Sequence, residues 1–418
     1  MKTISEKDRS RLRALAAHQM EVAQSDDMRR IYADWRAHGS FKHASRPMVT
    51  IELWTFAEHI LPELMQCEGE SARKIEEQLL AAVIPYEMFG DDTPVRPYYN
   101  VQLKKDFVPF GLPTRMSTVA NGRSVNGAGQ HCETYFHDLE QDWHLIAPST
   151  IRLNVAATER EVRELNELFG DLLPARRAGM SVPMGVAFDI MERISMEDLY
   201  VALYDAPERV HEMTSRLVDD YDTYCDLLEK SGVLLPACGD EPLLEGSYCF
   251  TDSLPSEGEG LTTKDLWGYL DAEEMNDVAP EMYKEFIIDH YMKLAARFGA
   301  ISYGCCEAVH RFWDGCIETL PNLRKVSISA WCDEYFMGER LRGREIVFHR
   351  KPTANLLGIQ RELDEDAVRA YFRETAQAAS ECKLEVSQRD IYLLHGNLPK
   401  VRRYVSLIRE TFDKYWRA

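Results

Sequence analysis

The sequence predicts an α/β fold, and within that class a (β/α)8 TIM barrel, from three observations. Short apolar runs typical of buried strands alternate with amphipathic helical segments through the second half of the chain. This alternation favours a parallel sheet with helices outside it. The chain has 418 residues and 45% hydrophobic content, which is enough for one barrel with extensions. Its length favours a closed barrel over a doubly wound sheet.

The first half of the chain predicts a helical extension, the first strand and an insertion. Residues 5–38 lack Pro and Gly, so we expect one or two amphipathic helices within an N-terminal extension over residues 1–45. The barrel is expected to occupy residues 46–418 and to begin with a buried strand at 48–54. Between residues 86 and 148 helical periodicity disappears, and frequent Pro, Gly, Tyr and Phe predict an irregular or β insertion that forms a lid or an edge hairpin.

The second half predicts alternating strands and helices. Asp205 is the expected N-cap of a helix that carries Pro207 in its first turn and ends at Gly232. The other predicted strands cover 243–250, 300–306, 324–331, 345–349 and 384–391, and the other predicted helices cover 262–275, 280–298 and 399–416.

Composition excludes several classes of function. A formal net charge of −20 argues against a nucleic-acid surface, because phosphate binding needs clustered Lys and Arg. No window of 18 apolar residues occurs and no secretory signal is visible, so we expect no membrane span and a cytoplasmic location. The ten cysteines are then expected to be reduced thiols. The glycine motifs of dinucleotide, nucleoside triphosphate and serine-hydrolase sites are absent, so the sequence does not support these three functions.

The ends of the predicted strands carry reactive side chains. In a parallel barrel the catalytic groups come from the carboxyl ends of the strands. Thiolate, imidazole and carboxylate are ligands that zinc accepts, and a zinc-bound substrate thiol becomes a nucleophile near neutral pH. We therefore expect a metal-assisted site at the open end of the barrel. The strand ends are Tyr248-Cys249-Phe250, Cys305-Cys306-Glu307, Trp331-Cys332-Asp333, His349-Arg350-Lys351 and the later His395.

Alternation along the strand predicts which of the adjacent cysteines faces the interior. Tyr303, Cys305 and Glu307 share one direction, and Cys306 takes the other, so Cys305 is expected to point inward. The predicted roles are metal binding for Cys305, Cys332 and His395, catalysis for Glu52, Tyr303 and Glu307, and substrate binding for Cys249, Cys306, His349 and Arg350.

Several predicted site residues also have a structural alternative. Cysteine is among the most buried residue types, and a thiol at a strand end is often a packing residue. His349 and His395 can be hydrogen-bonded structural groups. Glu307 can cap the helix that follows it.

Several segments resemble bacterial uroporphyrinogen decarboxylase-like proteins. The likeness covers most of the chain, and its most specific part is Tyr303-Gly304-Cys305-Cys306-Glu307. The resemblance implies a (β/α)8 barrel, and the wider superfamily includes corrinoid-dependent methyltransferases that pass methyl groups between a corrinoid protein and a thiol. The segments are Arg46–Val49, Leu203–Glu208, Thr251–Pro255, Thr263–Gly268, Arg297–Glu307 and Pro321–Ser329.

The resemblance also implies a zinc site. Those methyltransferases bind zinc through a His-x-Cys element at one strand end and a further Cys near the last strand. Here Tyr303 stands in place of the His, Cys305 matches the Cys, and His395 lies where the later Cys is expected. The Arg-rich motif that grips porphyrin carboxylates in true decarboxylases does not follow Arg46-Pro47, so porphyrinogen decarboxylation is not expected.

The leading hypothesis is a methyltransferase of corrinoid-dependent type. It would move a methyl group between a corrinoid-binding partner protein, or a methylated small molecule, and a thiol or other acceptor, with zinc at the site. One alternative is a metal-free lyase in which Arg350 and Lys351 grip a carboxylated small molecule. Another is a non-catalytic barrel that binds a corrinoid, a folate or a small metabolite. A homodimer is consistent with the superfamily.

Overall fold

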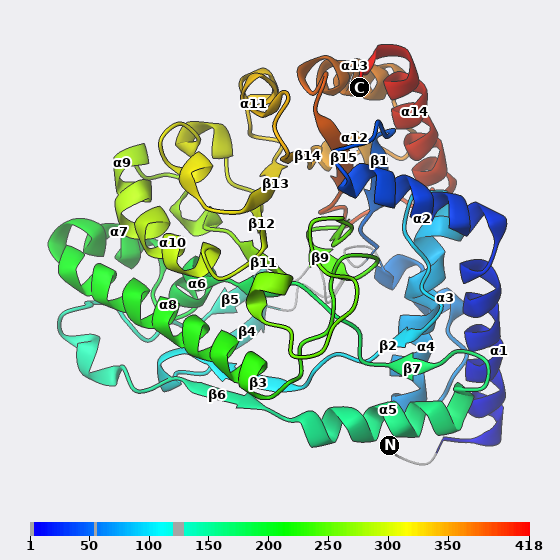
Figure 1. Cartoon of the computed structure of the whole chain (residues 1–418), viewed down its shortest axis with the longest axis horizontal. Coiled ribbons are helices and arrows are strands. Elements are labelled where there is room, and N and C mark those ends of the chain that lie inside the picture. The colour runs from blue at the N-terminus through cyan, green and yellow to red at the C-terminus, as the bar shows by residue number, and fades with distance from the viewer. Residues whose placement is uncertain (1–3, 54–56, 120–128) are drawn as a thin grey trace.

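The centre of the protein is a seven-stranded sheet in which all paired neighbours are parallel. The computed structural model describes residues 4–53, 57–119 and 129–418, and helices surround the sheet (Figure 1). The first strand of the chain pairs with the last, and the α/β class is confirmed. The strands, in their order across the sheet, are β1 (Met48–Ile51), β15 (Lys383–Gln388), β14 (Val347–Arg350), β13 (Leu323–Ile328), β12 (Ala300–Tyr303), β11 (Trp267–Leu270) and β8 (Val182–Met184).

A short antiparallel hairpin lies between the two edge strands of this sheet. It consists of β9 (Pro242–Leu244) and β10 (Ser247–Tyr248), and Figure 1 shows β9 between β11 to β13 on one side and β1 on the other. On the β8 side, Ser181 Oγ donates a hydrogen bond to Leu243 O at 3.3 Å. On the β1 side, Thr50 Oγ1 donates to Gly246 O at 2.8 Å. Within the described residues, the hairpin therefore links β8 and β1, which do not pair directly.

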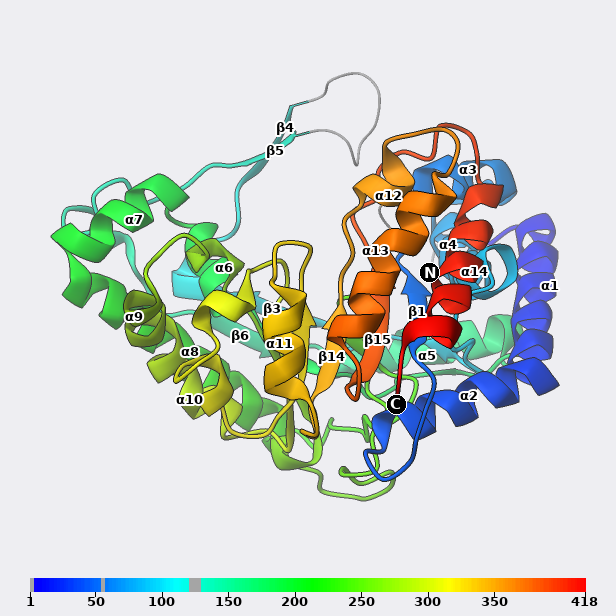
Figure 2. The same ribbon diagram turned by 90° about the horizontal axis from the view of Figure 1, so that it is seen from above.

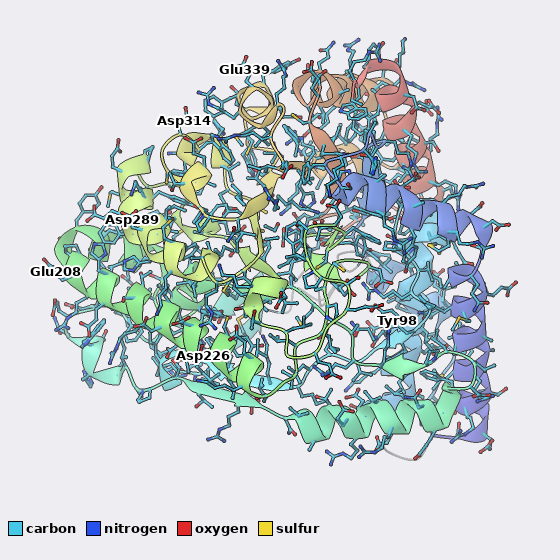
Figure 3. The ribbon with its side chains drawn as sticks, viewed as in Figure 1. Tyr98, Glu208, Asp226, Asp289, Asp314 and Glu339 are labelled. Atoms are coloured by element: carbon cyan, nitrogen blue, oxygen red, sulfur yellow. The ribbon has the colours of Figure 1, made fainter. Side chains whose placement is uncertain are left out.

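The helices form the outer layer. Figure 3 labels Glu208 and Asp226 on α8, Asp289 on α10 and Glu339 on α11, and these acidic side chains lie at the periphery of the molecule. The helices are α1 (Glu6–Ala23), α2 (Asp26–Gly39), α3 (Leu61–Leu64), α4 (Glu70–Ile84), α5 (Val155–Phe169), α6 (Val186–Met191), α7 (Met196–Asp205), α8 (Pro207–Lys230), α9 (Pro280–Tyr283), α10 (Asp289–Ala295), α11 (Glu334–Leu341), α12 (Asn355–Gly358), α13 (Glu365–Ala378) and α14 (Pro399–Tyr415).

Most predicted elements are confirmed. Helices α1 and α2 form the N-terminal segment, and Ser5 and Ser25 cap them by accepting hydrogen bonds from backbone N–H groups of the first turn. The helix predicted at 280–298 is α9, a π-helical turn and α10 in succession. The strands predicted at 324–331, 345–349 and 384–391 correspond to β13, β14 and β15, and the last predicted helix is α14.

The segment 86–148 has the expected irregular and β character. Its strands are paired in two-stranded ladders outside the central sheet, and the hairpin of β4 and β5 extends away from the body of the protein (Figure 2). Its residues 120–128, like Trp54 at the end of the first predicted strand, lie outside the described residues. The strands of these ladders are β2 (Tyr99–Asn100), β3 (Lys105–Val108), β4 (Met116–Val119), β5 (Gly129–Cys132), β6 (Thr150–Leu153) and β7 (Ala175–Arg176).

Two predicted elements and one predicted N-cap are wrong. The strand predicted at 243–250 is the hairpin of β9 and β10, which turns at Glu245-Gly246 and stands outside the parallel sheet. The helix predicted at 262–275 contains strand β11, because its capped first turn stops after Asp265. All four residues of β11 are buried, and such a short apolar run has no periodicity that separates strand from helix. Asp205 ends α7, and Ala206 is the N-cap of α8.

A buried ion pair holds the hairpin against the sheet. Lys325 Nζ of β13 lies 2.8 Å from Glu385 Oε2 of β15, and it also donates a hydrogen bond to Ser247 Oγ of β10. His38 Nε2 of α2 lies 3.1 Å from the same Glu385 oxygen. Burial opposes ionisation of Glu385, but Lys325, His349 and His38 hold its pKa well below the usual range. This cluster therefore connects α2, two strands and the hairpin.

Replacing Lys325 by Met should lower the free energy of unfolding by about 3–5 kcal/mol, because the substitution removes the main cation from a buried carboxylate. Urea denaturation measures the loss. Lys293→Met is the matched control, because Lys293 pairs with Asp219 and Asp222 with its side chain 48% exposed. That variant should lose no more than about 1 kcal/mol. Equal losses in the two variants would contradict the structural role given to Lys325.

Candidate functional site

Residues that follow the parallel strands gather at the carboxyl end of the sheet. Cys305 follows β12, Lys351 follows β14, and Arg389 follows β15. Glu52 follows β1, and Glu245 reaches the same place from the tip of the hairpin. This is the end at which parallel α/β folds carry their active sites.

Two adjacent thiols lie side by side at this end. The sulfur atoms of Cys305 and Cys306 are 3.6 Å apart, although alternation along a strand predicts opposite directions for them. The strand ends at Tyr303, and Gly304 has a φ of 97°, which redirects the chain before the two cysteines. Because the two sulfur atoms are in contact, Cys306 faces the same space as Cys305. Both thiols are half-buried.

Glu273 completes a group that can hold a metal ion. Ligand atoms of Glu273, Cys305 and Cys306 all lie within 4.8 Å of one another, and in the described part of the chain no other such group of three or more His, Cys, Asp or Glu occurs. A tetrahedral zinc ion with Zn–S bonds of about 2.3 Å places two sulfur ligands about 3.8 Å apart. The observed separation of 3.6 Å therefore fits zinc.

Two buried acidic side chains lie near this group. Asp271 Oδ1 and Glu274 Oε2 are buried without a hydrogen-bond partner among the described atoms. Burial raises the pKa of both carboxyl groups, that of Glu274 to about 7, and the charge of Glu307 adds to both shifts. A cation bound at the neighbouring Glu273 would offset this concentration of negative charge.

Glu307 positions the thiol loop. Its two carboxylate oxygens accept hydrogen bonds from the backbone N–H groups of Cys305 at 2.6 Å and Ala272 at 3.0 Å. The side chain is fully buried, and burial raises its pKa. Glu307 therefore ties the end of β12 to the end of β11, and both of its oxygens are already engaged.

Two cations lie on the other side of Cys305. Lys351 Nζ and Arg389 Nη1 both donate to Glu245 Oε2, and Arg389 Nε lies 2.6 Å from Glu52 Oε2. Lys351 Nζ also donates to Cys305 O at 3.0 Å. The site thus combines soft ligands with a cationic patch.

The Cys305 thiol contacts this patch. Its Sγ lies 3.3 Å from Glu245 Oε2 and 3.5 Å from Arg389 Nη1. The hydrogen bond to Cys306 and burial raise the pKa of Cys305 well above its usual range, while Lys351 acts in the opposite direction. A cation bound next to such a thiol would lower its pKa and favour the thiolate form.

The three residues predicted to bind metal do not form one group among the described residues. Only Cys305 belongs to the Glu273, Cys305 and Cys306 set. The sulfur of Cys332 lies 3.6 Å from both Ser329 Oγ and Glu307 O, and burial raises its pKa. His395 is exposed and its Nε2 lies 3.1 Å from Gly358 O.

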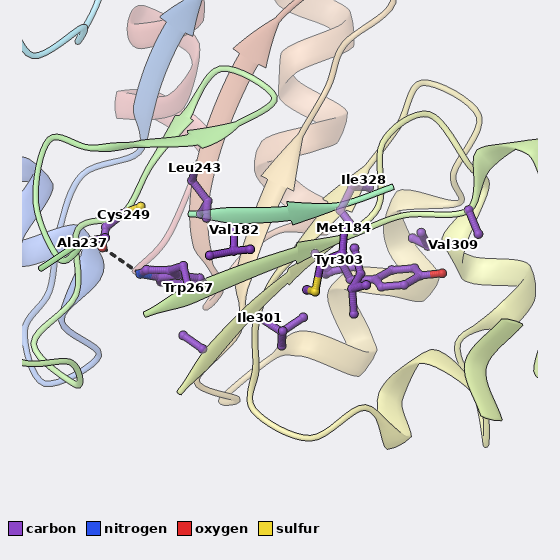
Figure 4. Packing of buried hydrophobic residues seen from close by; sticks show 14 of the residues in the cluster. Val182, Met184, Ala237, Leu243, Cys249, Trp267, Ile301, Tyr303, Val309 and Ile328 are labelled. Carbon is purple, nitrogen blue, oxygen red and sulfur yellow. Dashed lines mark hydrogen bonds between the residues drawn. The ribbon is translucent and has the colours of Figure 1, made fainter. Parts of the chain in front are cut away.

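Tyr303 and Arg350 point into the helical layer. The hydroxyl of Tyr303 forms a hydrogen bond with Tyr283 of α9, and Figure 4 shows its ring among buried apolar side chains. Arg350 is fully buried and pairs with Glu334 of α11 at 2.5 Å. Both side chains thus contact residues of the surrounding helices.

His349 and Cys249 are buried below the site. His349 Nε2 lies 2.8 Å from Ser387 Oγ, and burial lowers the pKa of this histidine to about 3. Cys249 follows the hairpin, and its carbonyl accepts a hydrogen bond from Trp267 Nε1 at 2.9 Å (Figure 4). Both residues help to hold the interior together.

Sequence reasoning missed Glu245, Glu273 and Arg389. Glu245 was placed inside a strand and Glu273 inside a helix, where neither predicts a site. Arg389 directly follows β15, and its position after a predicted apolar strand is the signal that could have found it.

No protein-family model matches the chain, and no curated protein matches its sequence. The resemblance to uroporphyrinogen decarboxylase-like proteins therefore stays an interpretation of the residues. None of the helices in the described segments has the length and apolar character that a membrane span requires.

Gly304→Ala should disturb the thiol pair. A Cβ at Gly304 would lie 3.2 Å from Ser327 Cβ, and the φ of 97° disfavours any side chain. Gly315→Ala is the matched control, because Gly315 also has a positive φ but its Cβ would meet nothing within 4 Å. Both variants should lose about 1–2 kcal/mol of stability from backbone strain. Only Gly304→Ala should also change the rate at which a thiol reagent modifies Cys305 and Cys306, measured by mass spectrometry, and equal rates in both variants would refute the role of Gly304.

Proposed function

We propose that the protein is a zinc-dependent methyltransferase that acts on a small molecule, with Cys305, Cys306 and Glu273 as the zinc ligands. The observation that carries the proposal is the pair of sulfur atoms 3.6 Å apart beside the Glu273 carboxylate, at the carboxyl end of a parallel sheet. Three protein ligands leave one tetrahedral position for a substrate atom, as catalytic zinc sites do.

Zinc at this position would supply the positive charge that favours the deprotonated form of a bound acceptor thiol. The chain's own residues keep the ligands in place. Ser327 Oγ donates to Cys305 O at 2.7 Å, and Glu307 accepts from the Cys305 N–H. The cysteine loop is thus held by two neighbouring elements before any substrate binds, which lowers the entropic cost of assembling the site.

The proposed transfer follows from the family resemblance. The acceptor sulfur forms a bond to the methyl carbon, and the bond between that carbon and its donor breaks with the electron pair staying on the donor. The acceptor's proton leaves to solvent. A corrinoid carried by a partner protein, or a methylated small molecule, is the proposed donor.

We further propose that the central sheet is the wall of a (β/α)8-type barrel. The pairing of the first strand β1 with the last strand β15 supports a cyclic arrangement, as does the hairpin that links β1 to β8. In such a barrel the hairpin of β9 and β10 would close the gap between the edge strands β1 and β8.

Metal analysis of purified protein tests the proposed ligands. The unmodified protein should hold about one zinc per chain, and Cys305→Ser, Cys306→Ser and Glu273→Gln should each reduce it below about 0.1. Cys332→Ser and His395→Ala are the controls, and both should retain the metal. Zinc below about 0.1 per chain in the unmodified protein would refute the zinc site. Loss of zinc in the two control variants would refute the ligand set.

The cationic patch favours a second candidate, a metal-free lyase that acts on a carboxylated small molecule. Lys351 and Arg389 converge on one carboxylate, that of Glu245, in the present structure. Activity that survives both chelation and Cys305→Ser would support this candidate over the methyltransferase.

A further inference from the structure

Glu245 occupies a position shaped for an anion. One of its oxygens, Oε2, accepts from both Lys351 Nζ and Arg389 Nη1 and lies 3.3 Å from Cys305 Sγ. The side chains of Lys351 and Arg389 are only 6% and 12% exposed. Two cations at this depth need a counterion, because an uncompensated buried charge is costly. The Glu245 carboxylate supplies it from within the chain.

The turn that carries Glu245 is strained. Leu244, Glu245 and Gly246 have φ values of 86°, 57° and 77°, and positive φ disfavours the first two of these residues. A glycine is required at the third position, since a Cβ there would lie 2.8 Å from Ser387 Cβ. The chain thus accepts unfavourable backbone conformations in order to bring a carboxylate to Lys351 and Arg389.

Open space lies beside the same turn. A largely apolar cavity of about 110 Å³ has Leu244 and Pro242 of the hairpin in its lining, together with Ser181 and Val182. Leu244, at the start of the turn, therefore borders open space, whereas Glu245 and Gly246 are not among the residues that line it. At the base of the turn, Lys325 Nζ donates a hydrogen bond to Ser247 Oγ.

We propose that Lys351 and Arg389 form the subsite for an anionic group of the substrate, and that Glu245 occupies this subsite until the substrate displaces it. The anion would be a carboxylate, a sulfonate or a phosphate, which lysine and arginine bind through charge-assisted hydrogen bonds. Because the subsite contacts Cys305, the substrate's reacting atom would lie a short spacer away from its anionic group, beside the two thiols. Glu52 keeps its contact with Arg389 Nε and holds the guanidinium in place during the exchange.

This inference names the substrate class for the proposed function, but its binding readout needs neither zinc nor turnover. The probes are 3-mercaptopropionate, which is anionic, and 3-mercapto-1-propanol, its neutral counterpart. Isothermal titration calorimetry on the full chain with a chelator present measures both dissociation constants. A failed zinc analysis would therefore contradict the proposed function alone, and a failed binding test would contradict the anion subsite alone.

Glu245→Gln should bind 3-mercaptopropionate about tenfold more tightly than the unmodified protein does, because the internal competitor loses its charge. Binding of the neutral probe should not change. A gain of affinity cannot arise from misfolding, so this variant tests the subsite directly. The control is Glu241→Gln, because Glu241 lies before the same hairpin and accepts from Gly239 N–H at 2.8 Å rather than from the two cations.

Lys351→Met and Arg389→Met should each abolish the preference for the anionic probe. The subsite is refuted if Glu245→Gln leaves the affinity for 3-mercaptopropionate unchanged. An equal gain for both probes would also overturn it, because steric opening of the site and not charge would then explain the effect. A gain in Glu241→Gln as large as that in Glu245→Gln would count against a specific role for Glu245.

Discussion

The buried pair of Lys325 and Glu385 is the interaction on which the rest of the arrangement depends. It joins β13 and β15 across the intervening strand β14, and through Ser247 and His38 it also fixes the hairpin and helix α2. A charged pair in this interior is stable because the oxygens of Glu385 meet Lys325 and His38, and Lys325 also meets Ser247. With the base of the hairpin fixed in this way, its tip reaches the carboxyl end of the sheet.

The two halves of the site differ in how they are held. The thiol half is rigid, since Glu307 and Ser327 bind the backbone of Cys305 and Gly304 sets the direction of the loop. In the cationic half, the carboxylate of Glu245 balances the charges of Lys351 and Arg389. Glu245 lies in a strained turn whose first residue, Leu244, borders a cavity. Hydrogen bonds to the backbone thus hold the thiols, and charge pairing with Glu245 holds the two cations.

The residues predicted for the site illustrate where strand alternation succeeds and where it fails. Cys305 was expected at the carboxyl end of the sheet and lies there, while the side chains of Tyr303 and Arg350 contact residues of the surrounding helices. Alternation holds only while the chain stays extended, and the positive φ of Gly304 ends it before Cys306. Glu273 and Glu245 sit in a 3-10 turn and a hairpin tip, where no periodicity marks a functional position.

The sequence by itself determined the α/β class, the helical N-terminal segment and the order of strands and helices after residue 280, because apolar periodicity is a local property of the chain. It also pointed to thiols at a strand end. Only the tertiary structure decided that Cys306 and Glu273 join Cys305, and that Glu245 meets Lys351 and Arg389. Glu273 and Cys306 are more than 30 positions apart in the sequence, and Glu245 and Lys351 are more than 100 positions apart. Long-range packing of the hairpin and the strand ends sets such contacts, and no local pattern encodes them.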